Sequence, residues 1–345
     1  MRSKWSSLVR AALALAFCGA LFAATAQAQQ IIGAGSTFVN PIMTHWVPDF
    51  QKTHSGVQIN YQSIGSGGGI QQLKNGLVDF GASDVALNDE QLKTMPSEIV
   101  QVPESAGPVC ITYNLEGLSK PLQLSGDALV NIYMGKITKW NDASIAKTNP
   151  GVKLPNTDIV VVHRSDGSGT TGIYTAYLSA VSSEWKSQVG SSTSVKWPAG
   201  LGGKGSEGVT GVVKQNPGSI GYVELSYALE NNLPVVHMQN QAGKYVAPSA
   251  ESASAAIDAF KAQLAKDVRD PIVNAPSNAP KAYPITGLTF LLVPTQSKDA
   301  AKGKMLKEFI GYVVTKGQAI APELHYAPLP ASISKLDQTL LQKVH

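Results

Sequence analysis

The chain has 345 residues, which is long enough for two hydrophobic cores of ordinary domain size. Its formal net charge is +4, but residues 1–28 hold three basic residues and no acidic one, so the rest has 25 basic and 24 acidic residues and a net charge of +1. This near neutrality excludes the broad basic field that attracts nucleic acids or anionic membranes, and we expect neither as a partner.

The first 28 residues have the features of a secretory signal peptide. A basic start precedes the apolar run "AALALAFCGALFAA", and Ala26-Gln27-Ala28 supplies a cleavage pattern of small residues. The apolar run is too short for a membrane anchor. A lipoprotein signal would use Cys18, a reading that the bulky Phe17 before it disfavours. We therefore expect an exported protein.

The remaining chain alternates short β-rich runs with helical patterns, which indicates the α/β class with mainly parallel sheet. The predicted strands are residues 57–64, 79–87, 157–164 and 284–293. The predicted helices are residues 69–78, 170–182 and 301–315, with the C-terminal stretch 332–345 also helical in pattern. Pro48 interrupts a further helical pattern that begins at residue 41, so we expect that helix to end or kink there.

Three stretches share one arrangement, in which a strand is followed by glycine and hydroxyl residues and then by a helix. They are "GAGSTF" (33–38), "GSGGG" (65–69) and "DGSGTTG" (166–172). The first N–H groups of a helix lack intrahelical partners, glycine allows a ligand to approach, and serine or threonine adds hydroxyl donors. One such junction can be an ordinary turn with a cap. Three together indicate an anion site.

Three charged residues narrow the choice of anion. Arg164 ends a strand and suits bidentate contact with an oxyanion, and Asp166 can hold its guanidinium or cap the helix. Asp84, in "GASDVA", would repel an anion unless the anion carries a proton, as phosphate does near neutral pH and sulfate does not. The sequence therefore favours phosphate over sulfate, with a loop-capping role for Asp84 as the alternative.

Other patterns support competing functions less well. "GKGSEG" (203–208) fits a dinucleotide-binding pattern but lacks the βαβ context, so we expect a loop and the start of a helix. A secreted phosphate-ester hydrolase would use Ser168 as nucleophile, His163 as base and Asp166 behind it, although "DGSGT" is not a nucleophile elbow. The histidines form no ligand pattern, so we expect no metal. Cys110 lies in an apolar run and is expected to be buried.

The chain resembles the periplasmic phosphate-binding proteins of bacterial high-affinity phosphate ABC importers. The resemblance covers nearly the whole chain after residue 28 and is carried in order by "GAGSTF", "GSGGGIQQL", "DFGASD", "GKITKWND", "HRSDGSGTT", "KWPAGLGGKG" and "GSIGYVE". It implies that Asp166 pairs with Arg164, and it leaves the role of His163 open. The phosphate contacts that it implies are Thr37 and Phe38 through their backbone N–H groups, Ser66, Asp84, Arg164, Ser168, Gly169 and Thr170.

The resemblance also implies a two-lobed binding protein with its ligand in the cleft between the lobes. We place one lobe at 29–103 plus 288–345 and the other at 109–283, joined by crossovers at 103–108 and 283–288. Such a protein is a monomer that delivers inorganic phosphate to a membrane permease. It is not an enzyme and needs no cofactor. A binding protein for another oxyanion is the nearest alternative.

Overall fold

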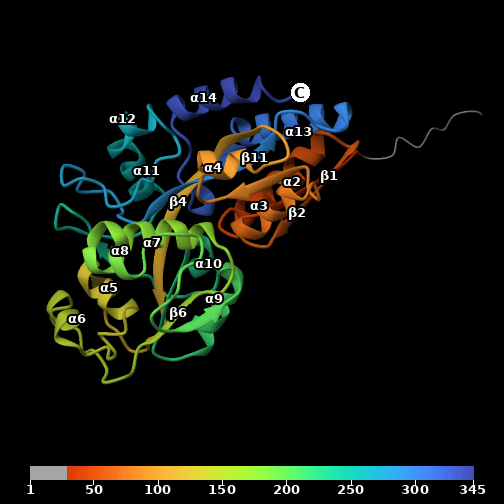
Figure 1. The fold of residues 1–345 in the computed structure, drawn as a ribbon. Coiled ribbons are helices and arrows are strands. Elements are labelled where there is room, and N and C mark those ends of the chain that lie inside the picture. The colour runs from red at the N-terminus through yellow and green to blue at the C-terminus, as the bar shows by residue number, and fades with distance from the viewer. Residues whose placement is uncertain (1–28) are drawn as a thin grey trace, which may run out of the picture.

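Residues 29–345 are described by a computed structural model of the chain, and the predicted signal peptide lies outside these residues. The described chain forms two α/β lobes that share one eight-stranded sheet of order β2-β1-β3-β11-β4-β8-β6-β7 (Figure 1). No helix within residues 29–345 is long and apolar enough to cross a membrane.

The first lobe begins with three parallel strands, in which β1 lies between β2 and β3. They are β1 (Gln29–Gly35), β2 (Val57–Ser63) and β3 (Phe80–Ser83), and they are joined by the helices α2 (Asn40–Thr53) and α3 (Ser66–Lys74). The strand predicted at 57–64 and the helix predicted at 69–78 are thus confirmed as β2 and α3. Pro48 does not end α2, because Trp46 and Phe50 are buried on either side of it and hold the last turn in place.

Two long antiparallel strands join the lobes. β4 (Ile99–Tyr113) pairs with β11 (Thr286–Pro294) through Pro108 and with β8 from Val109 onward, so it runs from one lobe into the other (Figure 1). The β4–β11 register shifts between Thr289 and Phe290, where the extra residue of β4 is Glu104. β11 is also antiparallel to β3, so the outer three strands on each side of the sheet are parallel to one another and the antiparallel pairs lie in the middle, at β11 and β4.

The second lobe repeats the parallel arrangement, with β6 between β8 and β7. Its main strands are β6 (Val160–Arg164), β7 (Leu201–Gly203) and β8 (Ser219–Glu224), and a small second sheet contains β5 (Gln123–Leu124), β9 (His237–Gln239) and β10 (Tyr245–Val246). Its helices are α5 (Gly126–Tyr133), α6 (Ala143–Thr148), α7 (Gly169–Val181), α8 (Ser183–Gln188), α9 (Gly205–Gln215) and α10 (Leu225–Glu230). The stretch "GKGSEG" begins at Gly203, the last residue of β7, and only Lys204 separates it from α9. The predicted helix start is therefore confirmed, whereas the expected lack of a βαβ context is wrong, because β7, α9 and β8 form such a unit.

The last part of the chain returns to the first lobe. It contains α11 (Ala250–Ala259), α12 (Lys261–Leu264), α13 (Ala300–Val313), the 3₁₀ helices η1 (Lys316–Ile320) and η2 (Pro322–Leu324), and α14 (Ala331–Leu341), while α4 (Asp89–Lys93) precedes β4. α11 lies before the expected second crossover, yet Ala253 and Ile257 of this helix share a buried cluster with Leu73 and Val78 of the first lobe.

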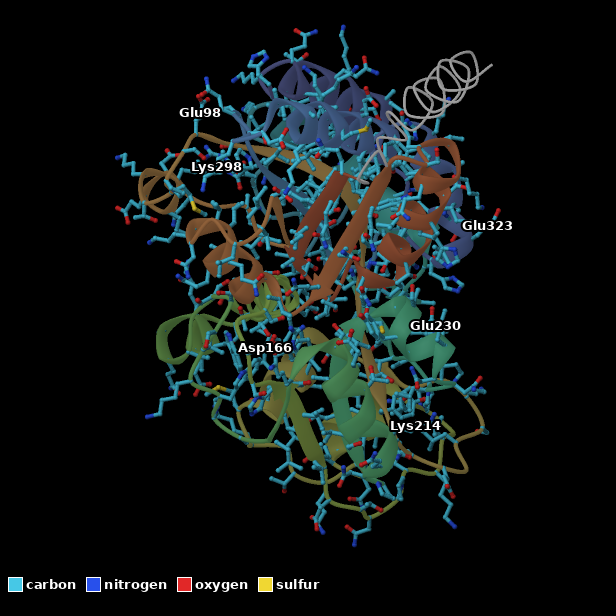
Figure 2. The ribbon with its side chains drawn as sticks, turned by 90° about the vertical axis from the view of Figure 1, so that its right-hand side faces the viewer. Glu98, Asp166, Lys214, Glu230, Lys298 and Glu323 are labelled. Carbon is cyan, nitrogen blue, oxygen red and sulfur yellow. The ribbon has the colours of Figure 1, made fainter. Side chains whose placement is uncertain are left out.

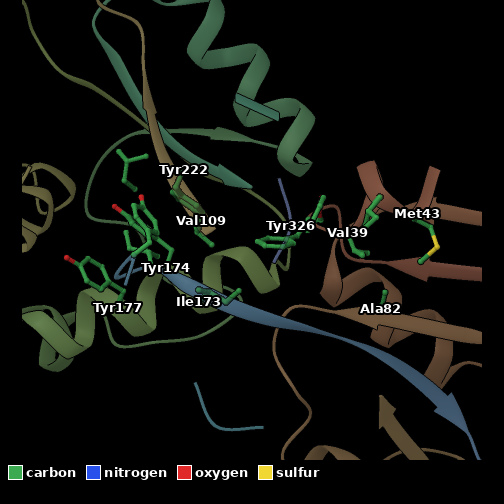
Figure 3. Close-up of a cluster of buried hydrophobic side chains, with 14 of the residues drawn as sticks. Val39, Met43, Ala82, Val109, Ile173, Tyr174, Tyr177, Tyr222 and Tyr326 are labelled. Atoms are coloured by element: carbon green, nitrogen blue, oxygen red, sulfur yellow. The ribbon is translucent and has the colours of Figure 1, made fainter. Parts of the chain in front are cut away.

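The largest buried cluster runs through both lobes. Figure 3 shows it extending from Tyr174 and Tyr222 in the second lobe to Val39 and Met43 in the first, with Tyr326 between them. Cys110, on the central strand β4, is fully buried as expected. The two lobes are therefore connected by packed side chains as well as by strands.

Candidate functional site

The three predicted glycine and hydroxyl junctions meet between the lobes. Ser36 to Phe38 follow β1, and α3 begins at Ser66. On the facing lobe, α7 begins at Gly169, and the backbone N–H of Gly169 donates a hydrogen bond to Ser66 Oγ at 3.0 Å. Thr170 Oγ1 donates to the Asp84 carboxylate at 3.0 Å. The carboxyl ends of β1 and β3 and the N-terminus of α7 thus form one site.

Arg164 and Asp166 form a bidentate ion pair at this site. Arg164 Nε donates to Asp166 Oδ1 at 2.7 Å and Nη2 donates to Oδ2 at 2.6 Å, while Nη1 reaches Thr37 Oγ1 across the cleft at 3.1 Å. Burial alone would raise the pKa of Asp166, but the hydrogen bonds and charge of Arg164 outweigh it and the pKa is lowered. Arg164 is 3% exposed, and Figure 2 shows Asp166 at the junction of the lobes. Asp166 therefore holds Arg164, as the resemblance implies.

Asp84 is a buried carboxylate that receives hydroxyl donors on both oxygens. Ser36 Oγ donates to Oδ1 and Thr170 Oγ1 donates to Oδ2. Burial raises the pKa of Asp84 to about 6, against the opposing effects of these two hydrogen bonds and of the Arg164 charge. The group is therefore largely ionised at neutral pH and can accept a proton from a ligand.

A second buried carboxyl lies behind the site. Glu104, at the irregularity in β4, is fully buried and neither of its carboxyl oxygens has a hydrogen-bond partner among the described residues. Burial and the nearby charge of Asp84 raise the pKa of Glu104 well above its usual value. Burial therefore favours the neutral form of Glu104, which limits the negative charge next to the anion site.

Two backbone amides are unpaired at the site. Thr37 and Phe38 are 1% and 0% exposed, and neither backbone N–H donates a hydrogen bond to any of residues 29–345. Buried backbone donors are nearly always paired, and leaving one without a partner costs about 1–3 kcal/mol. These two N–H groups therefore suit an external acceptor next to Arg164 and Asp84.

Glycine is required where the lobes approach most closely. A Cβ on Gly169 would lie 2.6 Å from Ser66 Oγ and 2.6 Å from Asp84 N, closer than real atoms pack. Gly67 N donates to Gly167 O at 2.9 Å, and a Cβ on Gly67 would lie 3.0 Å from the facing Gly167 Cα. The glycines of these two junctions thus allow the lobes to close over the site.

Several residues outside the predicted set support it. Ser36, within the quoted "GAGSTF", is the donor to Asp84, and its position beside the predicted threonine is the signal that could have found it. Ser206 Oγ shares a 2.7 Å hydrogen bond with Thr37 Oγ1, and Gly205 N donates to Asp166 Oδ1 at 3.0 Å. These last two residues belong to the stretch that resembled a dinucleotide loop, and nothing in the sequence alone connects them to Thr37 and Asp166.

The side chains of a serine hydrolase triad are not arranged as one. Ser168 Oγ caps α7 by accepting from Thr171 N at 3.1 Å. The His163 ring stacks on Trp197 with ring centroids 4.9 Å apart, and its Nδ1 lies 3.0 Å from Arg164 O. Burial lowers the pKa of His163. Within residues 29–345, no group of three or more His, Cys, Asp or Glu is placed to hold a metal ion.

Comparison with known proteins gives a consistent result. A family model described as a PBP superfamily domain matches residues 22–316. The phosphate-binding protein PstS of Xylella fastidiosa Temecula1 is 48% identical over 307 residues, covering 89% of this chain and 83% of the relative, and that of Methanocaldococcus jannaschii is 40% identical over 328 residues, covering 88% and 83%.

Among solved structures, a putative phosphate ABC transporter substrate-binding protein of Clostridium perfringens with bound phosphate has a TM-score of 0.62 at 20% identity and covers 88% of this chain and 100% of its own. A phosphate-binding protein of Stenotrophomonas maltophilia has a TM-score of 0.65 at 20% identity, covering 90% and 94%. At this identity the structural likeness supports the two-lobed fold.

Proposed function

The chain belongs to the family of phosphate-binding proteins within the PBP superfamily, and from this membership we propose that it binds inorganic phosphate between its lobes. The observation that carries the proposal is the pair of buried, unpaired amides of Thr37 and Phe38, next to the Arg164 guanidinium and the Asp84 carboxylate. A tetrahedral oxyanion that still carries a proton satisfies all of these groups at once.

We propose that the phosphate oxygens are shared between the lobes. From the second lobe, Arg164 supplies a full positive charge and the N-terminus of α7 supplies a partial positive charge. From the first lobe, the loop after β1 supplies backbone N–H groups. Hydrogen bonds to a charged group contribute about 1.5–3 kcal/mol each, so a handful supports tight binding after the ordering costs. The proposed contacts are Thr37 and Phe38 through N–H, Ser66, Asp84, Arg164, Ser168, Gly169 and Thr170.

Asp84 gives the site its proposed selectivity. A phosphate P–OH donates to the carboxylate, whereas sulfate carries no proton and would place two acceptors against each other. The hydroxyls of Ser36 and Thr170 already donate to Asp84, which leaves its remaining lone pairs for the ligand proton. Sulfate is therefore rejected although its size and shape match phosphate.

Ligand binding is proposed to favour the closed arrangement of the lobes, because the contacts come from both. We propose that the first lobe contains residues 29–103 and 288–345 and that residues 109–249 belong to the second. The packing of α11 with Leu73 and Val78 supports moving the segment from residue 250 to the second crossover at 283–288 into the first lobe. In the periplasm, the closed form then delivers phosphate to the membrane permease of an ABC importer. The protein acts as a monomer.

Binding and hydrolysis are separated by one experiment. The protein without residues 1–28, stripped of ligand by unfolding and refolding, is dialysed against radiolabelled phosphate, and the same sample is incubated with p-nitrophenyl phosphate. We expect saturable phosphate binding, no release of nitrophenol, and a Ser168→Ala variant that binds phosphate more weakly. Turnover that Ser168→Ala abolishes would overturn the proposal in favour of the hydrolase.

A further inference from the structure

The unpaired amides of Thr37 and Phe38 share one feature, which is that the carbonyl oxygen of each peptide unit accepts a side-chain hydrogen bond. The N–H of Thr37 shares a rigid, planar peptide unit with the carbonyl of Ser36, and the N–H of Phe38 shares one with the carbonyl of Thr37. A group that holds either carbonyl therefore also fixes the direction in which the amide N–H points.

A tyrosine hydroxyl holds each of these carbonyls. Tyr61 OH donates to Ser36 O at 2.7 Å and Tyr227 OH donates to Thr37 O at 2.6 Å. Hydrogen bonds in a chain polarise one another in a buried environment, so a donor on the carbonyl makes the N–H of the same unit a stronger donor. Both phenols thus act on the amides without touching the ligand position.

The two tyrosines come from different lobes. Tyr61 is on β2, in the same lobe as the amides, whereas Tyr227 is on α10 of the facing lobe. Tyr227 OH also lies 3.0 Å from Glu207 Oε1, but its single proton serves one acceptor at a time and Thr37 O is the nearer. The Tyr61 contact can therefore exist in an open form, and the Tyr227 contact requires closure.

We propose that Tyr61 and Tyr227 are positioning residues that orient and polarise the Thr37 and Phe38 amides for the anion. This inference rests on the proposed function, since it assigns the amides to phosphate. Tyr61 orients and polarises the Thr37 N–H before the ligand binds. Tyr227 orients and polarises the Phe38 N–H only when the lobes close, which couples closure to ligand affinity.

The chain supplies a matched control in Tyr326. Its hydroxyl donates to Phe38 O at 2.6 Å, so a third tyrosine holds the next carbonyl along the chain. The N–H in that peptide unit belongs to Val39 and donates to Ser36 Oγ at 3.3 Å. The same hydroxyl also lies 3.1 Å from Glu224 Oε2, much as the Tyr227 hydroxyl lies near a carboxylate. Removing the Tyr326 hydroxyl therefore costs similar buried hydrogen bonds without taking a donor from either of the two carbonyls described above.

The test compares Tyr61→Phe, Tyr227→Phe and Tyr326→Phe by calorimetric titration with inorganic phosphate, stopped-flow release and amide NMR. We expect phosphate affinity to fall about threefold to tenfold in Tyr61→Phe and in Tyr227→Phe and to stay unchanged in Tyr326→Phe. Tyr61→Phe should shift the Thr37 amide proton resonance in the ligand-free protein. Tyr227→Phe should act mainly by faster release.

The outcomes separate this inference from the proposed function. A wild-type protein that does not bind phosphate would refute the proposed function itself. Normal wild-type binding with unchanged affinity in both Tyr61→Phe and Tyr227→Phe would overturn the positioning role alone. Equal losses in all three variants, in step with their urea stability, would also overturn it, because a general structural effect would then account for the data.

Discussion

Replacing Asp84 with asparagine tests the proposed proton readout with the smallest change in shape. In the structure Ser36 and Thr170 each donate a hydroxyl proton to one carboxylate oxygen of Asp84. Asparagine keeps a single acceptor oxygen and puts an NH₂ group at the other position. One of the two hydroxyls must then turn to accept, and the amide can donate to an unprotonated anion.

The two anions should respond in opposite directions. Phosphate loses a charge-assisted hydrogen bond, which costs about 1.5–3 kcal/mol, roughly tenfold to 150-fold in affinity. Sulfate has no proton to donate, so the carboxylate of Asp84 opposes its binding by about 1–3 kcal/mol or more, and the asparagine removes this penalty. The ratio of phosphate to sulfate affinity should therefore fall by about a hundredfold or more.

Both affinities are measured by calorimetry on ligand-free protein. Asp158→Asn is the matched control, because it makes the same chemical change at an exposed carboxylate whose partner is Lys139. The control should leave both affinities unchanged. An Asp84→Asn variant that keeps the parent's ratio of phosphate to sulfate affinity would refute the reasoning and leave Asp84 as a loop-capping residue.

Three other measurements follow from the geometry. Since the pKa of Asp84 is about 6, sulfate affinity should rise as the pH falls through about 6, where the carboxyl gains a proton to donate; Ser36→Ala should move this rise to higher pH, and a pH-independent sulfate affinity would contradict the assignment. Gly67→Ala puts a Cβ 3.0 Å from the facing backbone, so it should weaken phosphate binding by about 1–3 kcal/mol, whereas Gly211→Ala, with nothing within 4 Å, should leave affinity unchanged in the same titration. Asp337 is buried, neither of its carboxyl oxygens has a hydrogen-bond partner within residues 29–345, and its pKa is raised to about 8. The folded state therefore holds a proton that the unfolded state loses above about pH 4. The free energy of unfolding should fall as pH rises to about 8, and urea titrations of Asp337→Asn should show a smaller fall; an equal fall would contradict this.

The local elements could be predicted because each has a local cause. The continuous apolar run in "TDIVVVHR" predicts a strand, and the helical spacing of Ile173, Tyr177 and Leu178 predicts the following helix, both of which the structure contains. The interval in β4 from residue 103 to 108 was expected only as a crossover. Its strand of fifteen residues depends on pairing with β11 and β8, whose residues are more than a hundred positions away.

The site could be predicted only in part. Glycine and hydroxyl residues between a strand and a helix signal an anion site locally. The charges of Asp84 and Arg164 narrow the choice of anion, whereas Ser168 enters the site only through the family resemblance. Tyr61 and Tyr227 carry no such signal, because a tyrosine in an amphipathic segment is indistinguishable from a core residue. Their role depends on which carbonyl each hydroxyl reaches, and one of those contacts crosses between the lobes.

The proposed phosphate site is tested most directly by calorimetric titration of the ligand-free protein, first with phosphate and separately with sulfate, at neutral pH. We expect tight binding of phosphate and no measurable heat of binding with sulfate. Comparable binding of the two anions would contradict the proton-reading role of Asp84. Binding of neither would mean that the unpaired amides of Thr37 and Phe38 do not form an anion site.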